Sequence, residues 1–359
     1  MTSMSDDSQN AALHLEGRTV GEGWVVGPRN KPHQDATGGY FSITYPVARR
    51  DGAQGFLKVL NLAKAFDSDY FIDELNWLTA EYVAERDLCI LCGEQRLSRV
   101  VTAIDHGQFQ LSGFLMAPIS YIIFELATHD VRVAMSTSQR LDATLQLHYL
   151  HNLATGVAQL HARRIAHQDL KPSNFLVFPA DATGKEVGKI GDLGRAFRSG
   201  SASPHDTMEI PGDHIYAPPE QLYRHTYADE ATRRYAADLY QVGSIATFLI
   251  TGTTMNAHLA AHIPEPLHWN VYGDTYQEAI PYLDHAFGAT LESLSLPFSD
   301  QLNQRFRQVL RYLCEPDAER RGHPAARRSR HGSPYRLERI VSELDLIARR
   351  AALEVRDAS

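Results

Sequence analysis

The stretch His167-Gln168-Asp169-Leu170-Lys171-Pro172-Ser173-Asn174 decides how this sequence is interpreted. A short apolar run separates it from Asp192-Leu193-Gly194, and Ala217-Pro218-Pro219-Glu220 follows further along the chain. Taken singly, Asp, Asn and Lys beside Pro and Ser are also what an ordinary solvated turn contains. The ordered series is much harder to obtain by chance, so it indicates a functional site.

The residue types in this series suit phosphoryl transfer from ATP. This chemistry needs a carboxylate beside the attacking hydroxyl and oxygen ligands that hold magnesium on the phosphates. Asp169 could orient and deprotonate a substrate hydroxyl, and Asn174 and Asp192 could supply the hard oxygens that Mg2+ prefers. Lys171 could neutralise charge on the transferred group. The sequence therefore predicts an enzyme that uses ATP and Mg2+.

In order and spacing, these motifs resemble the catalytic loop and the metal-binding loop of protein kinases, and the resemblance covers most of the chain. The family indicated is the bacterial eukaryotic-like (Hanks-type) serine/threonine kinases. The serine/threonine type rests on Lys171, which stands two residues after Asp169 as in serine/threonine members. The resemblance implies an α+β, bilobal protein-kinase-like fold, with a small β-rich N-lobe that has one long helix and a larger, mostly helical C-lobe. The expected parts are a flexible leader (1–17), N-lobe and hinge (18–127), C-lobe (128–348) and a tail (349–359).

The expected N-lobe holds most of the residues that the resemblance assigns to ATP. Gly38 and Gly39 fall where kinases carry a glycine-rich loop for the phosphates, but Thr37 and Ser42 replace its outer glycines and a plain hairpin turn is the alternative. Lys58 lies in the middle of an apolar strand and, by the resemblance, reaches the α- and β-phosphates. The alternative for Lys58 is an edge-strand lysine that faces solvent.

A lysine in that position needs a carboxylate partner from the helix that follows. Glu74, Glu81 and Glu85 recur at seven- and four-residue steps, so they share one face of the helix. We predict Glu85, with Glu81 second, because Glu85 lies nearest to the next expected strand, as the helix glutamate does in the kinase family that the sequence resembles. The segment 121–127 is similar to the kinase hinge, which implies that backbone groups of Glu125 and Ala127 face adenine.

Several further residues are given structural roles by the resemblance. Glu220 is expected to be buried and to pair with Arg321. Asp238 is expected to hold the catalytic loop from below by hydrogen bonds. His167 is interpreted as a tether of the metal-binding loop and not as a base, because Asp169 already fills that role.

Gln168 departs from the family pattern, in which an arginine is common at this position. That arginine normally pairs with a phosphate added to the activation segment, and a neutral glutamine cannot. We therefore predict that activity does not require phosphorylation of the activation segment. Thr207, Ser201 and Ser203 are still candidate phosphosites.

Composition limits the partners and the location. The formal net charge of −8 gives no support for general nucleic-acid binding, and the longest apolar run (242–250) is too short and too polar to span a bilayer. The polar N-terminus and the three cysteines favour the cytoplasm. We read the pair Cys89 and Cys92 as helix packing, since no second CxxC or matching His pair follows. The expected partners are protein substrates, with no nucleic acid and no membrane.

Two other functions are compatible with the same residues. The first is a pseudokinase that binds a nucleotide or a partner but transfers nothing, which the irregular glycine loop and Gln168 would suit. The second is a small-molecule phosphotransferase of the aminoglycoside or choline kind, which shares the spacing from Asp169 to Asn174. Such an enzyme has no reason to keep Glu220, Asp238 and Arg321 together.

Overall fold

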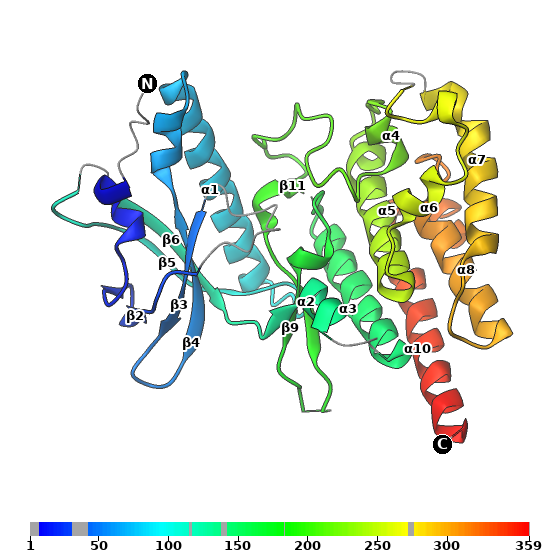
Figure 1. Ribbon diagram of the computed structural model, residues 1–359, viewed down its shortest axis with the longest axis horizontal. Helices are drawn as coiled ribbons and strands as arrows, with labels where there is room; N and C mark the ends of the chain where they lie inside the picture. Colours follow the sequence, from blue (N-terminus) through cyan, green and yellow to red (C-terminus); the bar gives the residue numbers. More distant parts are fainter. Residues whose placement is uncertain are drawn as a thin grey trace. The chain divides into compact units, whose positions relative to one another are not determined.

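Two units make up the computed structural model (Figure 1). It describes residues 7–30, 42–114, 117–137, 142–182, 184–271 and 276–358. The unit called the N-lobe here comprises Met1–Arg96 and Val100–Thr128, and the unit called the C-lobe comprises Leu97–Arg99 and His129–Ser359. A sheet with one long helix forms the first, and the second is mostly helical, so the predicted α+β class is confirmed.

The N-lobe sheet is antiparallel and has the strand order β1-β2-β3-β4-β6-β5. Its strands are β1 (Thr19–Val20), β2 (Trp24–Val26), β3 (Ser42–Ala48), β4 (Gln54–Leu60), β5 (Ala103–Gln110) and β6 (Pro118–Glu125). In β4 the side chains alternate between the two faces, as in any strand. Leu57 and Val59 are fully buried in the hydrophobic core on one face, which places Lys58 on the other.

The first described residues belong to the N-lobe core. Two short 3-10 helices occur there, η1 (Asp7–Gln9) and η2 (Ala11–Leu13). Ala11, Ala12 and Leu15 are buried in the same core cluster as the sheet residues, and the Tyr45 hydroxyl donates to the carbonyl of Ala12 at 2.7 Å. The prediction of a flexible leader over 1–17 is therefore wrong for residues 7–17, because these apolar side chains gain more by covering the sheet than by staying in water.

The long helix of the N-lobe is α1 (Phe71–Glu94), which follows the 3-10 helix η3 (Leu62–Asp67). The Tyr82 hydroxyl donates to the carbonyl of Tyr121 on β6 at 2.9 Å and fixes the helix to the sheet. Cys89 and Cys92 lie on α1 and are buried, and burial raises the pKa of the Cys92 thiol to about 11. A thiol protonated at neutral pH acts as a small apolar side chain, so the structure supports packing at this pair.

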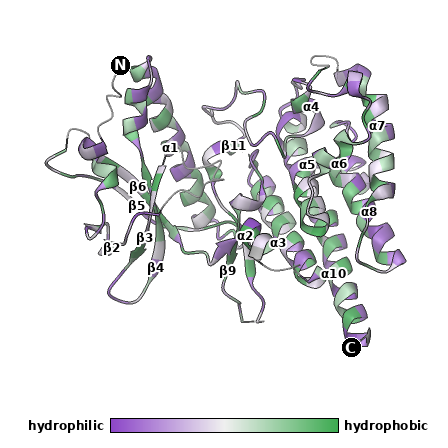
Figure 2. Cartoon of the chain, viewed as in Figure 1, coloured by the Kyte–Doolittle hydropathy of each residue, from purple (hydrophilic) through white to green (hydrophobic). Residues whose placement is uncertain are grey.

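The C-lobe is centred on α5 (Glu230–Thr251), which is buried along most of its length. Figure 2 shows hydrophobic residues gathered along this helix. It packs against α3 (Ala143–Ala162) and α8 (Asp300–Cys314), and α10 (Glu338–Ala358) packs against both of these helices. The predicted tail over 349–359 is wrong as far as Ala358, because α10 continues there and buries Ala351.

Small elements complete the C-lobe and carry the loops of the expected site. Two of its sheets are antiparallel, with the orders β10-β9-β7 and β11-β8. The strands are β7 (His129–Asp130), β8 (Ile165–Ala166), β9 (Phe175–Phe178), β10 (Val187–Ile190) and β11 (Phe197–Arg198). The remaining helices are α2 (Val131–Thr137), η4 (Pro172–Asn174), η5 (Leu193–Arg195), α4 (Pro219–Leu222), α6 (Met255–Ala260), η6 (Glu265–Leu267), α7 (Tyr276–Ser293) and α9 (Pro324–Arg327).

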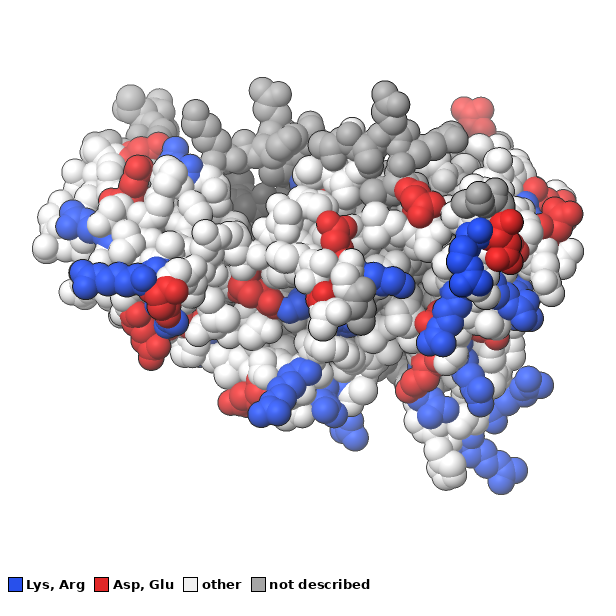
Figure 3. Space-filling view, turned by 90° about the horizontal axis from the view of Figure 1, so that it is seen from below, with Lys and Arg blue, Asp and Glu red and all other residues white. Residues whose placement is uncertain are grey.

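On the face seen in Figure 3, basic and acidic side chains are interspersed among the described residues. Mixed signs of this kind keep the local potential from building up over a wide area. Within the described ranges, no helix combines the length and the apolar character needed to cross a membrane.

Candidate active site

A buried carboxylate on α5 holds the backbone of the catalytic loop. Asp238 Oδ2 accepts hydrogen bonds from His167 N and from His161 Nε2, both at 2.8 Å, and Oδ1 accepts from Gln168 N at 2.7 Å. The Asp238 side chain is fully buried. A carboxylate that receives three donors offsets much of its desolvation cost. The expected role of Asp238 as a support below the loop is present in the structure.

Gln168, the residue before Asp169, has a left-handed backbone that is held by polar contacts. Its φ of 65° is left-handed, which costs a non-glycine residue about 1 kcal/mol. Four polar contacts offset this cost: its N–H bonds to Asp238, its carbonyl accepts from Gln241 Nε2 at 2.9 Å, its Oε1 accepts from Arg234 Nη1 at 2.6 Å and its Nε2 donates to the carbonyl of Arg195 at 3.3 Å. The backbone that enters Asp169 is therefore fixed from both sides.

The side chain of Asp169 lies among donors. Its Oδ1 accepts from the amide of Asp213 at 2.8 Å, and its Oδ2 lies 3.0 Å from Lys171 Nζ and 3.3 Å from Asn174 Nδ2. Burial raises the pKa of Asp169 above its ordinary value, Lys171 opposes this shift, and the charge of Asp192 acts in the same direction as burial. A carboxylate with a raised pKa accepts a proton more readily, which suits a general base.

Two short strands bring Asn174 and Asp192 to the same end of a hairpin. β9 begins directly after Asn174 and β10 ends two residues before Asp192, and the amide of Gly191 donates to the carbonyl of Asn174 at 2.8 Å. Asn174 Nδ2 donates to the main-chain carbonyl of Asp169 at 2.9 Å, so its Oδ1 is the atom left for a metal ion. Asp192 has a left-handed backbone, with φ of 56°.

This donor set fits a magnesium ion that shares its ligands with phosphate. Mg2+ is usually held by one or two protein oxygens together with substrate phosphates and water. Asn174 and Asp192 supply two hard oxygens of that kind. Among the described residues there is no group of three or more His, Cys, Asp or Glu that could hold a metal ion by themselves. A site completed by phosphate oxygens is thus the arrangement that these residues suit.

His167 ties the catalytic loop to the metal-binding loop. Its Nδ1 accepts from the amide of Asp169 at 3.2 Å, so Nε2 carries the proton and donates to the carbonyl of Gly191 at 3.0 Å. The ring is fully buried. With both nitrogens engaged, His167 is a tether, in agreement with the role expected for it.

The N-lobe contains the expected lysine and glutamate as a contact pair. Lys58 Nζ lies 2.7 Å and 2.8 Å from the two carboxylate oxygens of Glu85, on the face of the sheet that α1 covers. The side chain of Glu85 is 5% exposed and that of Lys58 is 24% exposed. Glu85, not Glu81 or Glu74, is therefore the helix glutamate seen in this contact.

The other residues expected at the nucleotide are placed as follows. Gly38 and Gly39 lie outside the described residues. Glu125 is the last residue of β6, where its amide donates to the carbonyl of Thr102 at 3.1 Å and its Oε1 accepts from the amide of Thr102 at 2.7 Å. Ala127 lies two residues further along, in the connector, and is half-buried.

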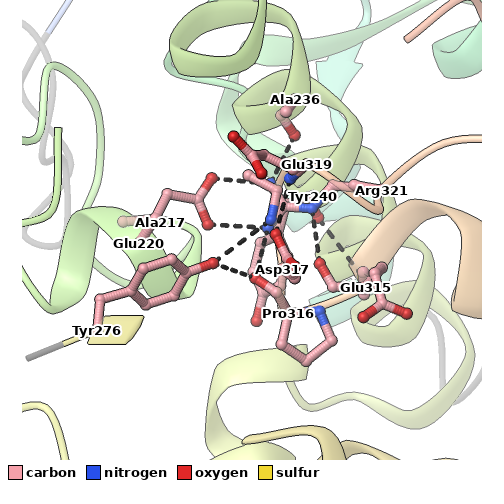
Figure 4. A network of polar contacts seen from close by, with 12 residues as sticks. Ala217, Glu220, Ala236, Tyr240, Tyr276, Glu315, Pro316, Asp317, Glu319 and Arg321 are labelled. Atoms are coloured by element: carbon pink, nitrogen blue, oxygen red, sulfur yellow. Dashed lines mark hydrogen bonds and ion pairs between the residues drawn. The ribbon is translucent and has the colours of Figure 1, made fainter. Parts of the chain in front are cut away.

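A second buried charge pair lies in the C-lobe (Figure 4). Arg321 Nη1 and Nη2 donate to Glu220 Oε1 and Oε2 at 2.9 Å and 2.8 Å, in the bidentate geometry that suits guanidinium and carboxylate. The remaining donors bond to the carbonyls of Glu315, Ala236 and Pro316. With Arg321 fully buried and fully bonded, this pair fixes α4 to the loop after α8 and plays a structural part.

The model of the protein kinase domain matches residues 99–328, well over half of the 359 residues. This chain belongs to the protein kinase family. The match contains the catalytic loop, the metal-binding loop and both members of the Glu220 and Arg321 pair. The N-lobe residues Lys58 and Glu85 precede it.

Several curated kinases are similar to parts of this kinase. It is 31% identical over 149 residues to the serine/threonine-protein kinase atg1 of Dictyostelium discoideum, which is 41% of this chain and 20% of that protein. It is 37% identical over 134 residues to the serine/threonine-protein kinase SSN3 of Mycosarcoma maydis, 35% of this chain and 17% of that protein. It is 36% identical over 106 residues to the inactive serine/threonine-protein kinase PLK5 of Mus musculus, 30% of this chain and 16% of that protein. The alignments thus span a fifth or less of these relatives.

Motif reasoning assigned Asp238 but missed its neighbours on α5. Arg234 and Gln241 lie four residues before it and three residues after it, so the three side chains form one row on the helix. Gln241 Oε1 accepts from the amide of Leu170 at 3.0 Å, in addition to the contact of Gln241 with Gln168. In the sequence, the signal that could have identified Arg234 and Gln241 is this row of polar residues in a helix that is otherwise largely apolar.

The activation segment contributes another residue that motif reasoning missed. His205 is 1% exposed, its Nδ1 lies 2.7 Å from Arg195 Nη1 and its Nε2 lies 3.0 Å from the carbonyl of Gly194. Because the guanidinium can only donate, Nδ1 accepts and Nε2 carries the proton. Burial lowers the pKa of His205 to about 4, Arg195 and Arg234 act in the same direction, and the carbonyl of Gly194 and the charge of Asp206 oppose the shift.

Replacing Glu85 by glutamine removes the charge opposite Lys58 and keeps the size of the side chain. We expect phosphoryl transfer to fall by about tenfold or more, because the ammonium is no longer held in one place. Initial rates with labelled ATP measure this, with Glu74→Gln on the same helix as the control. Equal rates in wild type and Glu85→Gln would rule out a part for this pair in transfer.

Replacing Asp238 by asparagine leaves the loop with fewer acceptors than donors. The amide group of asparagine would face N–H groups of the loop, so at least one buried donor loses its partner. We expect the free energy of unfolding to fall by roughly 2–4 kcal/mol. Denaturant unfolding measures it, and Asp357→Asn near the end of α10, where the side chain is 75% exposed, should change it by less than about 0.5 kcal/mol. A loss no larger than that of the control would contradict this account.

Acid should destabilise the folded kinase partly through His205. Its pKa is about 4 in the folded protein and near 6.5 when unfolded, so between these values only the unfolded chain binds the proton and stability falls as the pH falls. In His205→Gln, which keeps a donor and an acceptor, the loss of unfolding free energy from pH 7 to pH 5 should be smaller by about 1 kcal/mol. Denaturant curves at both pH values test this, and an equal loss in the two proteins would refute it.

Proposed function

We propose that this protein is a kinase that transfers the γ-phosphoryl group of ATP to serine or threonine hydroxyls of protein substrates, in the presence of Mg2+. We include autophosphorylation in the proposal. The observation that carries it is the environment of Asp169, a buried carboxyl with a raised pKa beside Lys171, Asn174 and Asp192. These are the groups that phosphoryl transfer requires.

In this proposal each group has one task. Asp169 orients the substrate hydroxyl and accepts its proton as the oxygen attacks the γ-phosphorus, and the bond to the β-phosphate oxygen breaks. Lys171 Nζ, 3.0 Å from the Asp169 carboxylate, lies where it can also neutralise the phosphoryl oxygens. Asn174 and Asp192 would hold the magnesium ion, which when bound neutralises charge on the phosphates.

The N-lobe residues are proposed to bind the nucleotide. Lys58, fixed by Glu85, reaches the α- and β-phosphates. The backbone of Gly38 and Gly39 approaches the phosphates. The carbonyl of Glu125 and the backbone of Ala127 bind the adenine edge. These assignments rest on the family pattern stated above for the corresponding positions.

Substrate type and origin belong to the same proposal. The choice of serine and threonine rests on Lys171 and on the names of the relatives, which are serine/threonine kinases from eukaryotes. We also propose, from the sequence, that this kinase is of the bacterial eukaryotic-like type and that it works in the cytoplasm. The three free cysteines, all buried, agree with a reducing compartment.

A pseudokinase is the second candidate. One relative is named as an inactive kinase, and Gln168 departs from the family pattern in this chain. Against it, Asp169, Lys171, Asn174 and Asp192 are all present, and the side chains of Lys171 and Asn174 both lie within hydrogen-bonding distance of Asp169. The transfer experiment below separates the two candidates.

The decisive test compares wild type with Asp169→Asn after phosphatase treatment, with mass spectrometry to verify that phosphate has been removed. We expect Mg2+-dependent transfer from labelled ATP to the protein itself and to a generic basic protein. In the mutant the rate should fall by about a hundredfold or more, because asparagine cannot take the proton.

Nucleotide affinity, measured with a fluorescent ATP analogue, should be similar in both proteins. No transfer by wild type with the analogue still bound would favour the pseudokinase. Activity that vanished on phosphatase treatment would refute the independence from phosphorylation predicted from Gln168.

A further inference from the structure

An ion pair joins the activation segment to α5. Asp206 Oδ1 lies 2.8 Å from Arg234 Nη2, and Asp206 Oδ2 accepts from the amide of Ser203 at 3.0 Å. The amide of Asp206 donates in turn to the carbonyl of Ser203 at 3.1 Å. The carboxylate is thus part of a closed turn over 203–206, and this turn is held at Arg234.

The same arginine continues the connection to the catalytic loop. Arg234 Nη1 donates to Gln168 Oε1 at 2.6 Å, so one guanidinium bonds to the activation segment with one nitrogen and to the catalytic loop with the other. Its plane also lies over the ring of Phe197 on β11, with 4.6 Å between the guanidinium carbon and the ring centre. The Arg234 side chain is only 2% exposed. A cation at this depth needs a carboxylate partner, and Asp206 provides it.

This arrangement explains why a glutamine occupies position 168. Its amide oxygen accepts from Arg234 while its amide nitrogen donates to the carbonyl of Arg195. An arginine at 168 has only donors and would place a second guanidinium against the first. The cation that meets the activation segment is therefore Arg234 on α5 and not a residue of the catalytic loop. Its anionic partner is the carboxylate of Asp206 and not an added phosphate.

A neighbouring contact fastens the same turn to the metal-binding loop. His205, the residue before Asp206, bonds to the carbonyl of Gly194 and to the side chain of Arg195. Residues 205 and 206 together connect three parts of the C-lobe: the metal-binding loop, α5 and, through Arg234, the catalytic loop. In kinases that are switched on by phosphorylation, a phosphate paired with arginine orders this segment.

We propose that Asp206 and Arg234 are positioning residues, whose ion pair holds the activation segment against the catalytic loop through Gln168 and takes the place of an activating phosphate. This inference rests on the proposed kinase function and specifies how its site is regulated. With this ion pair in place, the active site is ready for phosphoryl transfer as soon as the chain has folded.

The test uses phosphatase-treated full-length protein and the variant Asp206→Asn, which removes the charge and keeps the shape. Glu209→Gln is the matched control, because Glu209 is an exposed acid of the same segment, and its carboxylate lies 4.0 Å from Arg224 Nε. We expect kcat for a basic protein to fall by roughly tenfold in Asp206→Asn, with little change in the KM for ATP. Asp206→Glu should recover part of the rate, and Glu209→Gln should match wild type.

The double variant Asp206→Asn with Arg234→Met separates positioning from mere structural support. It removes both charges of the ion pair and leaves no buried guanidinium without its carboxylate, so it should recover any thermal stability lost in Asp206→Asn but not the rate. Recovery of the rate together with stability, or an unchanged rate in Asp206→Asn, would overturn the proposal. A rise in rate for Gln168→Arg would also overturn it, because the second guanidinium is expected to lower the rate.

Hydrogen exchange tests the ion pair without relying on activity. In Asp206→Asn, amides of residues 199–208 and of the catalytic loop 167–171 should exchange at least about tenfold faster than in wild type, while Glu209→Gln should not differ. Unchanged exchange in the catalytic loop would refute the coupling. If wild type transferred no phosphate, the proposed function would fail on that result alone, and exchange would still decide whether the ion pair couples the two segments.

Discussion

The buried carboxylate of Asp238 is the constraint on which the C-lobe site depends. It lies in α5, where water cannot solvate it, so it must be satisfied by protein donors. Those donors are two successive amides of the catalytic loop and the ring of His161. An unpaired charge at this depth would be costly, so the hydrogen bonds from the loop to Asp238 stabilise the position of the loop on the helix. These bonds also offset the cost of the left-handed backbone of Gln168.

α5 combines this role with packing of the C-lobe core. Most of its surface is buried against other helices, but Arg234, Asp238 and Gln241 form a polar row that faces the loop. Each of the three contacts Gln168 through a different atom of that residue. One helix thus sets the position of the residue before Asp169, and through Arg234 it is also joined to the activation segment.

In the N-lobe, too, a charged side chain is held by a partner on a helix, but this pair is less buried. The sheet alternation places Lys58 opposite the apolar core, and α1 supplies Glu85 to meet it. Because Lys58 keeps some contact with water, its ion pair with Glu85 contributes little to the free energy of unfolding. Its main effect is to fix the position of the Lys58 ammonium group. The short N-terminal helices cover the far face of the sheet and stabilise the lobe through Ala11, Ala12 and Leu15.

The sequence by itself indicated the protein kinase family, the α+β class and the pairing of Glu220 with Arg321, and it limited the partner of Lys58 to the glutamates on one face of a helix, with Glu85 preferred. It could do so because these residues stand in ordered motifs or at helical spacing, and such local patterns are visible in one dimension. The burial of residues 7–17, the full extent of α10 and the contacts of Arg234 with Asp206 and Gln168 were decided only by the tertiary structure. Each of these depends on partners distant along the chain, and neither composition nor spacing shows which distant surfaces will remove a side chain from water.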